Sequence, residues 1–103
     1  MSGDDYRKGR EALEREDWIE AIRALLAAVK DDPHHVPSFI SLIESYEGAA
    51  GEYGDPDLLD QASRVCRDAR EMTLDDEQRQ FLEAAAARIE GRLNELREQS
   101  RDN

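Results

Sequence analysis

Apolar residues recur along most of this chain at steps of three and four, which is the period of an α-helix. The pattern is clearest in residues 14–33, EREDWIEAIRALLAAVKDDP, where small alanines are interspersed with large apolar side chains. Residues spaced in this way lie on one side of a helix and can be buried together. No stretch shows the strict alternation of a half-buried strand. The sequence therefore predicts an all-α fold.

Residue types typical of helix ends mark the first helices. The first helix is predicted over residues 4–16, and the second begins after Asp17, a good N-cap, and stops before Pro33. Pro37 suits the first turn of a third helix. The apolar face predicted for the second helix consists of Trp18, Ile19, Ile22, Leu25, Leu26 and Val29.

Residues 47–56, EGAAGEYGDP, concentrate glycine and end in Asp-Pro, which is typical of a loop. Asp55 as cap and Pro56 as first helical residue then predict the start of a fourth helix. A fifth helix is expected from Asp75 or Asp76 to about residue 99. The whole chain, residues 1–103, is expected to form a single domain.

The charge of the chain excludes some classes of partner. Its 103 residues carry a formal net charge of -11, which repels phosphate backbones and anionic lipid head groups, so neither nucleic acid nor a membrane is an expected partner. Cys66 is the only cysteine, and no segment has the length of a membrane span, so a cytoplasmic location is expected. Lys8 and Lys30 are the only lysines. This composition is typical either of proteins from salt-rich cytoplasm or of a GC-rich genome.

The small residues have a physical role in packing. Two antiparallel helices approach closely only where small side chains face each other. Gly9 and Ala12 of the first helix are therefore expected to meet Ala21 of the second, and Leu25 and Ala28 to continue the contact.

This order of small residues, followed by Pro33, resembles the tetratricopeptide repeat, a helix-turn-helix unit of about 34 residues. The resemblance implies a right-handed superhelical stack of antiparallel helix pairs with five helices. It divides the chain into a first repeat (2–35), a second repeat (36–76), a capping helix (77–99) and a tail (100–103).

The second unit matches the repeat less closely and is longer. Gly9 and Ala21 are 12 residues apart, whereas the corresponding Ile43 and Ala62 are 19 apart, which leaves seven extra residues. Seven residues make about two helical turns. We expect them to lengthen both helices of this pair by about one turn, with residues 47–56 as the turn.

In the repeat family, the first helix of each pair lines a groove that binds a protein segment. The resemblance thus implies a non-enzymatic interaction module whose partner is a protein or peptide that is not acidic. The family's chaperone-tail clamp needs basic and amide side chains that are missing here at most of its positions, so a chaperone tail is not expected. Helical spacing places in the groove Tyr6, Arg10, Leu13, Ile40, Glu44, Glu47, Phe81, Ala85 and Arg88.

Few residues suggest chemistry. There is no phosphate-binding glycine loop and no nucleophile beside a base, and we expect no cofactor. His34 and His35 adjoin two aspartates, but adjacent side chains seldom converge on one metal, so exposed loop residues are expected rather than ligands. Cys66 is expected to fill the core rather than react. Trp18 is expected to pack over the preceding turn, with a partner contact as the alternative.

A second surface lies on the fifth helix. Leu82, Ala86, Ile89, Leu93 and Leu96 are spaced 4, 3, 4 and 3, the a/d pattern of a coiled coil. One interpretation is packing within the chain. The other is self-association through Leu93 and Leu96, which predicts a weak homodimer in place of a monomer.

Overall fold

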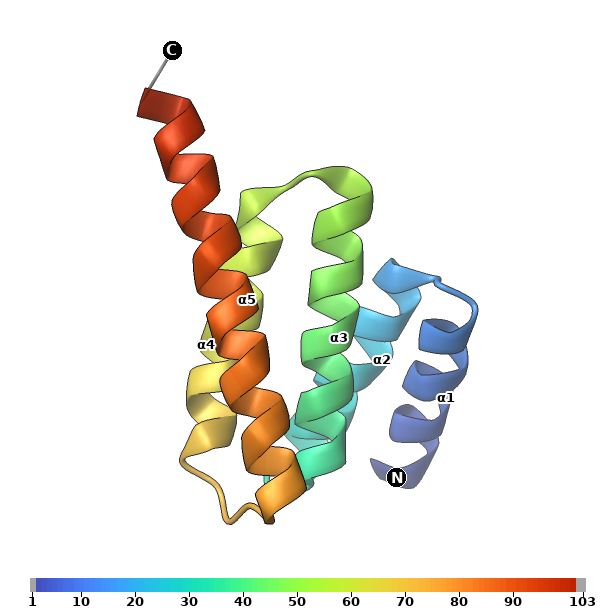
Figure 1. Ribbon diagram of the computed structural model, residues 1–103. Coiled ribbons are helices and arrows are strands. Elements are labelled where there is room, and N and C mark those ends of the chain that lie inside the picture. The colour runs from blue at the N-terminus through green and yellow to red at the C-terminus, as the bar shows by residue number, and fades with distance from the viewer. Residues whose placement is uncertain (1, 102–103) are drawn as a thin grey trace.

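A computed structural model describes residues 2–101 and consists of five α-helices joined by short connections (Figure 1). The helices are α1 (Ser2–Glu14), α2 (Trp18–Asp31), α3 (Val36–Tyr53), α4 (Pro56–Arg70) and α5 (Asp76–Arg101). No strand occurs between residues 2 and 101, so the predicted all-α fold with five helices is confirmed for this part of the chain.

Three of the helix starts follow from aspartate caps. The Asp17 carboxylate accepts a hydrogen bond from the backbone N–H of Glu20, at a distance of 3.4 Å. The Asp55 carboxylate accepts one from the backbone N–H of Asp57, at 3.0 Å. At the start of α5, the side chains of Asp75 and Gln78 accept from each other's backbone N–H at 2.8 and 3.1 Å, which is a capping box. The predicted starts of the second, fourth and fifth helices are therefore confirmed.

The loop predicted over residues 47–56 is wrong. The α3 helix continues to Tyr53 and ends at Gly54, whose φ of 64° closes the helix in the left-handed conformation. Only Gly54 and Asp55 connect α3 to α4. Ala49 and Ala50 are 0% and 2% exposed, so packing holds in the helix a segment whose glycines would otherwise weaken it.

The two helices of the second pair are longer than those of the first, although the turn between them is only Gly54 and Asp55 and not the whole of the predicted residues 47–56. The α3 helix extends ten residues past Ile43, whereas α1 extends five residues past Gly9. The α4 helix begins six residues before Ala62, whereas α2 begins three before Ala21. These differences of about one turn each keep the buried faces in register.

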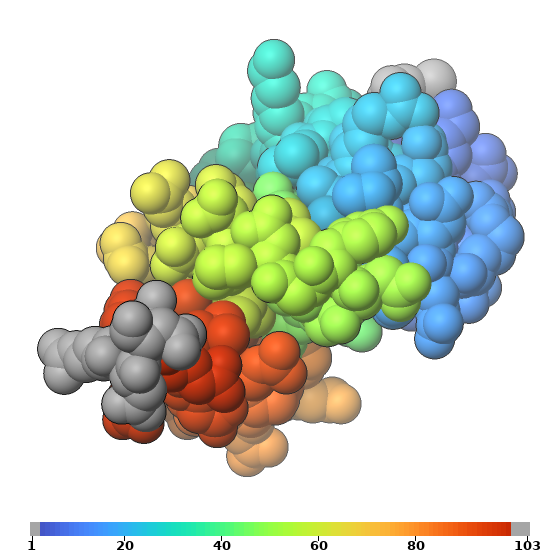
Figure 2. Space-filling model, turned by 90° about the horizontal axis from the view of Figure 1, so that it is seen from above, coloured from blue at the N-terminus to red at the C-terminus, as the bar shows by residue number. Residues whose placement is uncertain are grey.

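The helices form two layers. Consecutive helices pack against each other, and in addition α3 contacts both α1 and α5. The α1, α3 and α5 helices therefore form one layer, and all three run upward in Figure 1, while α2 and α4 run downward. Seen from above, the α3–α4 turn lies between the α1–α2 turn and the C-terminal part of α5 (Figure 2).

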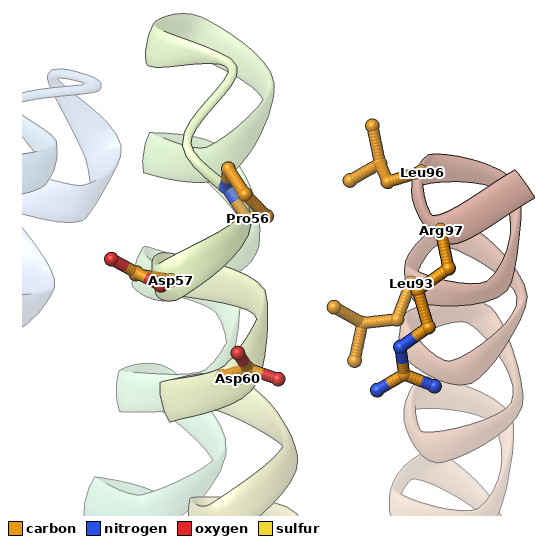
Figure 3. A pocket seen from close by; sticks show the side chains of 6 residues that line it. All are labelled: Pro56, Asp57, Asp60, Leu93, Leu96 and Arg97. Carbon is orange, nitrogen blue, oxygen red and sulfur yellow. The ribbon is translucent and has the colours of Figure 1, made fainter. Parts of the chain in front are cut away.

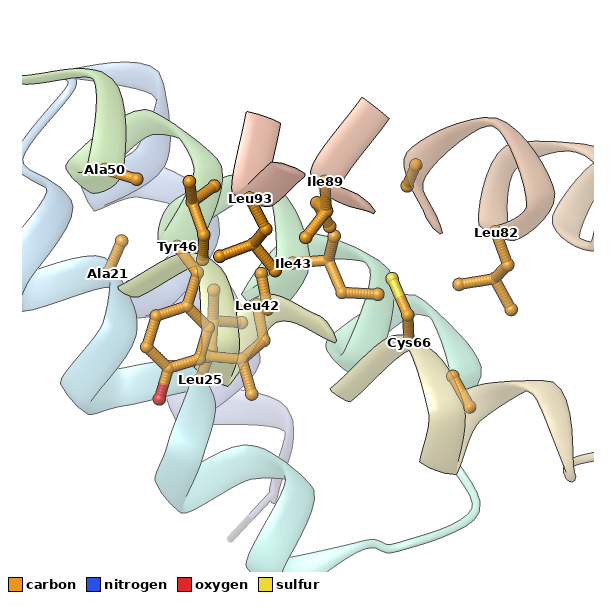
Figure 4. Packing of buried hydrophobic residues seen from close by; sticks show 14 of the residues in the cluster. Ala21, Leu25, Leu42, Ile43, Tyr46, Ala50, Cys66, Leu82, Ile89 and Leu93 are labelled. Carbon is orange, nitrogen blue, oxygen red and sulfur yellow. The ribbon is translucent and has the colours of Figure 1, made fainter. Parts of the chain in front are cut away.

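Small residues allow close contact between the helices of the core. A Cβ placed on Gly9 would lie 2.5 Å from Cγ of Leu25, so the absence of a side chain at Gly9 makes room for the buried leucine. Ala12 and Ala21 are fully buried. Larger side chains from α2, α3 and α5 fill the rest, together with Cys66 of α4 (Figure 4).

The apolar face predicted for the second helix is correct only in part. Leu25 is fully buried, but Ile19 is 57% and Leu26 44% exposed. Most residues of α2 are apolar, so apolar spacing alone does not distinguish its inner side from its outer side. Trp18 is half-buried and occupies the space where a Cβ of Gly48 on α3 would lie.

Candidate binding face

The residues predicted for a groove come from the three helices of one layer. We call eight of them the α1–α3–α5 face: Tyr6, Arg10, Leu13, Ile40, Glu44, Glu47, Phe81 and Arg88. Seven of these are half-buried and Arg88 is exposed, so their side chains lie at the surface of the layer. Ala85 does not belong to this face, because it is fully buried between helices. Its assignment to the groove is wrong.

Arg10 of α1 joins this helix to α3. Its Nη1 donates a hydrogen bond to Oγ of Ser41 at 3.2 Å and lies 3.8 Å from Oε1 of Glu44. Ser41 is 2% exposed, and its backbone carbonyl accepts a hydrogen bond from the Ser45 hydroxyl at 2.8 Å. The guanidinium is thus held between a buried hydroxyl and a half-exposed carboxylate.

Glu47 of α3 and Arg88 of α5 form the second link across the face. Nε and Nη2 of Arg88 donate to the two oxygens of Glu47 at 3.2 and 2.9 Å, which is a bidentate pair. The hydrogen bond from Glu47 raises the pKa of Arg88 above its ordinary value. The two links together connect α1 to α3 and α3 to α5.

The surroundings of Glu44 disfavour the charged form of its carboxylate. Its partial burial raises its pKa above the ordinary value, and the negative charge of Glu47 raises it further. The positive charges of Arg10 and Arg88 lower the pKa but do not outweigh these effects. The charge on Glu44 is therefore only partly compensated within the chain.

One end of the face is apolar. Tyr6, Ile40 and Phe81 each lie near the N-terminal end of their helix, and the three helices run in the same direction (Figure 1). The ring of Tyr6 packs edge to face on His35, with the centroids 4.9 Å apart. The His35 Nδ1 is 2.6 Å from Oγ of the buried Ser38. The turn before α3 thus supports the aromatic end of the face.

The leucine stripe of α5 faces the interior of the chain. Leu82, Ile89 and Leu93 are at most 5% exposed and belong to the core. Leu96 is half-buried and packs against the same core. This placement favours packing within the chain over a coiled-coil seam, because the side chains that a partner helix would need are already covered.

A pocket of about 250 Å³ opens beside the end of this stripe (Figure 3). Pro56, Asp57 and Asp60 of α4 form one wall, and three α5 residues form the other, Leu93, Leu96 and Arg97. It lies between α4 and α5, and none of the eight residues of the α1–α3–α5 face lines it.

Cys66 and the histidines do not form a reactive site. Cys66 is 1% exposed, and burial raises the pKa of its thiol to about 11, so the thiolate is scarce at neutral pH. His34 is exposed, and His35 packs on Tyr6. Within residues 2–101, no three side chains of His, Cys, Asp or Glu are grouped so that they could hold a metal ion.

Two contacts were not predicted from the sequence. Ser41 is the hydrogen-bond partner of Arg10, and the ring of Trp18 packs against Gly48. Ser38, Ser41 and Ser45 recur at steps of three and four among the apolar residues of α3. That spacing indicates buried hydroxyls, and it is the signal by which Ser41 could have been found.

No helix between residues 2 and 101 combines the length and the apolar character that crossing a membrane requires. Comparison of the chain with family models, with curated proteins and with solved structures finds no match.

Proposed function

We propose that this chain is a non-enzymatic interaction module of the tetratricopeptide type, which binds a protein segment on the α1–α3–α5 face. In this proposal residues 2–35 and 36–76 are two repeats, residues 77–99 cap a right-handed stack, and residues 100–103 are a tail. The proposal assigns no catalytic role and no cofactor to any residue.

The observation that carries the proposal is the convergence of side chains from three helices on one surface. Arg10 pairs with Glu44 and Arg88 pairs with Glu47, so each ion pair joins residues that are far apart in the sequence and lie on different helices of the layer. Beside them, the half-buried side chains of Tyr6, Ile40 and Phe81 provide surface that a partner can contact. Tyrosine, phenylalanine and arginine, which this face carries, are enriched in protein–protein interfaces.

Self-association through α5 is the less supported alternative. Leu93 is 5% exposed, so it has little surface left for a second copy. Leu96 and the pockets between α4 and α5 leave room for such a contact in the described part of the chain.

A selection of random peptides displayed on phage tests the proposal. We expect enriched peptides whose affinity for the chain falls at least about tenfold in the variant Tyr6→Ala, because a few central residues supply most of the binding energy of an interface. Isothermal titration calorimetry measures the affinity. The matched control is Tyr53→Ala, which removes the same side chain at an exposed position about 180° around α3 from Glu44.

The proposal fails if no peptide is enriched, or if every enriched peptide binds the Tyr6→Ala variant as tightly as the unchanged chain. Circular dichroism of both variants must show the same helix content as the unchanged chain, so that loss of binding is not loss of fold.

A further inference from the structure

We propose that the segment bound by the α1–α3–α5 face presents a lysine or arginine whose cationic head group lies between Glu44 and Glu47 of α3. This inference rests on the proposed function and adds the chemistry of the partner.

The charges on the face are arranged in a pattern with a negative centre. Glu44 and Glu47 lie three residues apart on the middle helix, about one turn, so both carboxylates face the same side. Arg10 approaches from α1 and Arg88 from α5. A segment crossing the face therefore meets two carboxylates at the centre and a guanidinium toward each edge.

Glu44 has capacity for another donor. Arg10 gives its hydrogen bond to Ser41, and its distance of 3.8 Å to Glu44 is too long for a second one. The side chain of Glu44 is 41% exposed, so a ligand can reach it. A lysine or arginine head group would supply the direct, charge-assisted hydrogen bond that Arg10 does not.

The protonation behaviour of Glu44 agrees with this assignment. Burial and the nearby Glu47 raise its pKa in spite of the two arginines. A third positive charge beside Glu44 lowers that pKa again, so binding of a cationic side chain is coupled to loss of a proton from any Glu44 that is still protonated.

The long-range field and the apolar end of the face favour the same kind of partner. The net charge of -11 attracts basic segments and repels acidic ones. The half-buried Tyr6, Ile40 and Phe81 lie toward the N-terminal ends of the same helices and provide surface for an apolar residue next to the basic one. A basic residue beside an apolar residue is therefore the motif that we expect.

The test uses peptides enriched by the phage selection, synthesised with each basic residue in turn replaced by norleucine. We expect one such replacement to weaken binding by at least about tenfold, because it removes a hydrogen bond between charged groups. On the protein side, Glu44→Gln should weaken binding of the unmodified peptide by a similar factor and leave the norleucine peptide unaffected. Glu83→Gln is the matched control, because this exposed residue lies about 200° around α5 from Phe81.

A measurement on the unchanged protein is independent of any folding defect in the variants. Calorimetry in buffers of different ionisation enthalpy should detect proton release on binding near the pKa of Glu44, and affinity should rise as pH rises through that pKa. The inference is overturned if enriched peptides need Tyr6 but contain no basic residue, or if Glu44→Gln binds them as tightly as the unchanged chain. Those results leave the proposed function in place. Peptides that bind without regard to Tyr6 overturn both.

Discussion

Gly9 and Gly91 each lie inside a helix, yet only Gly9 has a neighbour in the space where a side chain would begin. Leu25 of α2 fills that space, while no atom lies within 4 Å of it at Gly91. A glycine inside a helix costs about 1 kcal/mol relative to alanine. At Gly9 close helix packing offsets this cost, whereas at Gly91 nothing within the described part of the chain does.

The same difference separates the two ends of the molecule. Where α1, α2 and α3 meet, Gly9 and Gly48 accept Leu25 and Trp18 directly. Between α4 and the C-terminal part of α5, pockets of about 250 and 340 Å³ remain open. The α1–α2–α3 end thus contains close glycine contacts that the described part of the α4–α5 end lacks.

The largest expected change in the free energy of unfolding comes from the titration of Cys66. It tests whether the open packing at the end of α5 extends to the core. Burial raises the pKa of this thiol from 9.0 to about 11, so the folded protein keeps a proton that the unfolded chain has released. Below about pH 9 the thiol is neutral in both states. From pH 9 to pH 11 the free energy of unfolding should fall, by up to about 2–3 kcal/mol for two pKa units.

Urea unfolding across this pH range measures the loss, and Cys66→Ala is the control that should lack it. Tyr46, whose pKa is also raised by burial, contributes equally to both proteins. If the two proteins lose the same stability, Cys66 is accessible to water and the α5 end opens as far as the core.

Gly9→Ala should have the next largest effect. The new methyl group overlaps a leucine that is fully buried and has no free space to enter. Overpacking costs about 1–3 kcal/mol and the better helix propensity of alanine returns about 1, so we expect a net loss of up to about 2 kcal/mol. Urea unfolding measures it. In the double variant Gly9→Ala/Leu25→Ala, the loss of stability should be smaller than the sum of the two single losses, because the shortened side chain at position 25 makes room for the new methyl group. Additive losses would mean that the two residues do not share this space.

Gly48→Ala should have a smaller effect, because Trp18 is half-buried and its ring can move toward solvent. Alanine's better helix propensity offsets part of the cost, so we expect a net loss of stability of less than about 1 kcal/mol. Tryptophan fluorescence should shift to longer wavelength as the indole becomes hydrated. Trp18 is the only tryptophan, so the signal has one source. An unchanged emission spectrum would show that the ring does not rest on Gly48.

Gly48 also shows how far the sequence could predict the fold. Asp17, Asp55 and Asp75 act through neighbouring backbone atoms, so local residue types were enough to place three helix starts. The helical state of residues 47–53 depends on Trp18, about thirty residues earlier, and on Arg88 of α5. Local glycine content predicts a loop there because it carries no information on these distant partners.

Like the fold, the candidate face could be predicted from the sequence only in part. Helical spacing selected Arg10, Glu44, Glu47 and Arg88, and the structure joins them in two pairs. Spacing could not distinguish Ala85, which lies deeper between the helices and is buried. Depth within a layer depends on the distance between helices, and that distance is set by contacts such as Gly9 with Leu25.

Gly91→Ala is the smallest and most informative change, because it is expected to act in the opposite direction from Gly9→Ala. The site is exposed and has open space for a methyl group, so alanine should raise the free energy of unfolding by about 0.5–1 kcal/mol. Urea unfolding at two protein concentrations makes the measurement. A gain independent of concentration means that Gly91 has no packing role within the chain. A loss at every concentration would mean that a neighbouring side chain occupies this space in solution, and that the α4–α5 end is packed as closely as the other.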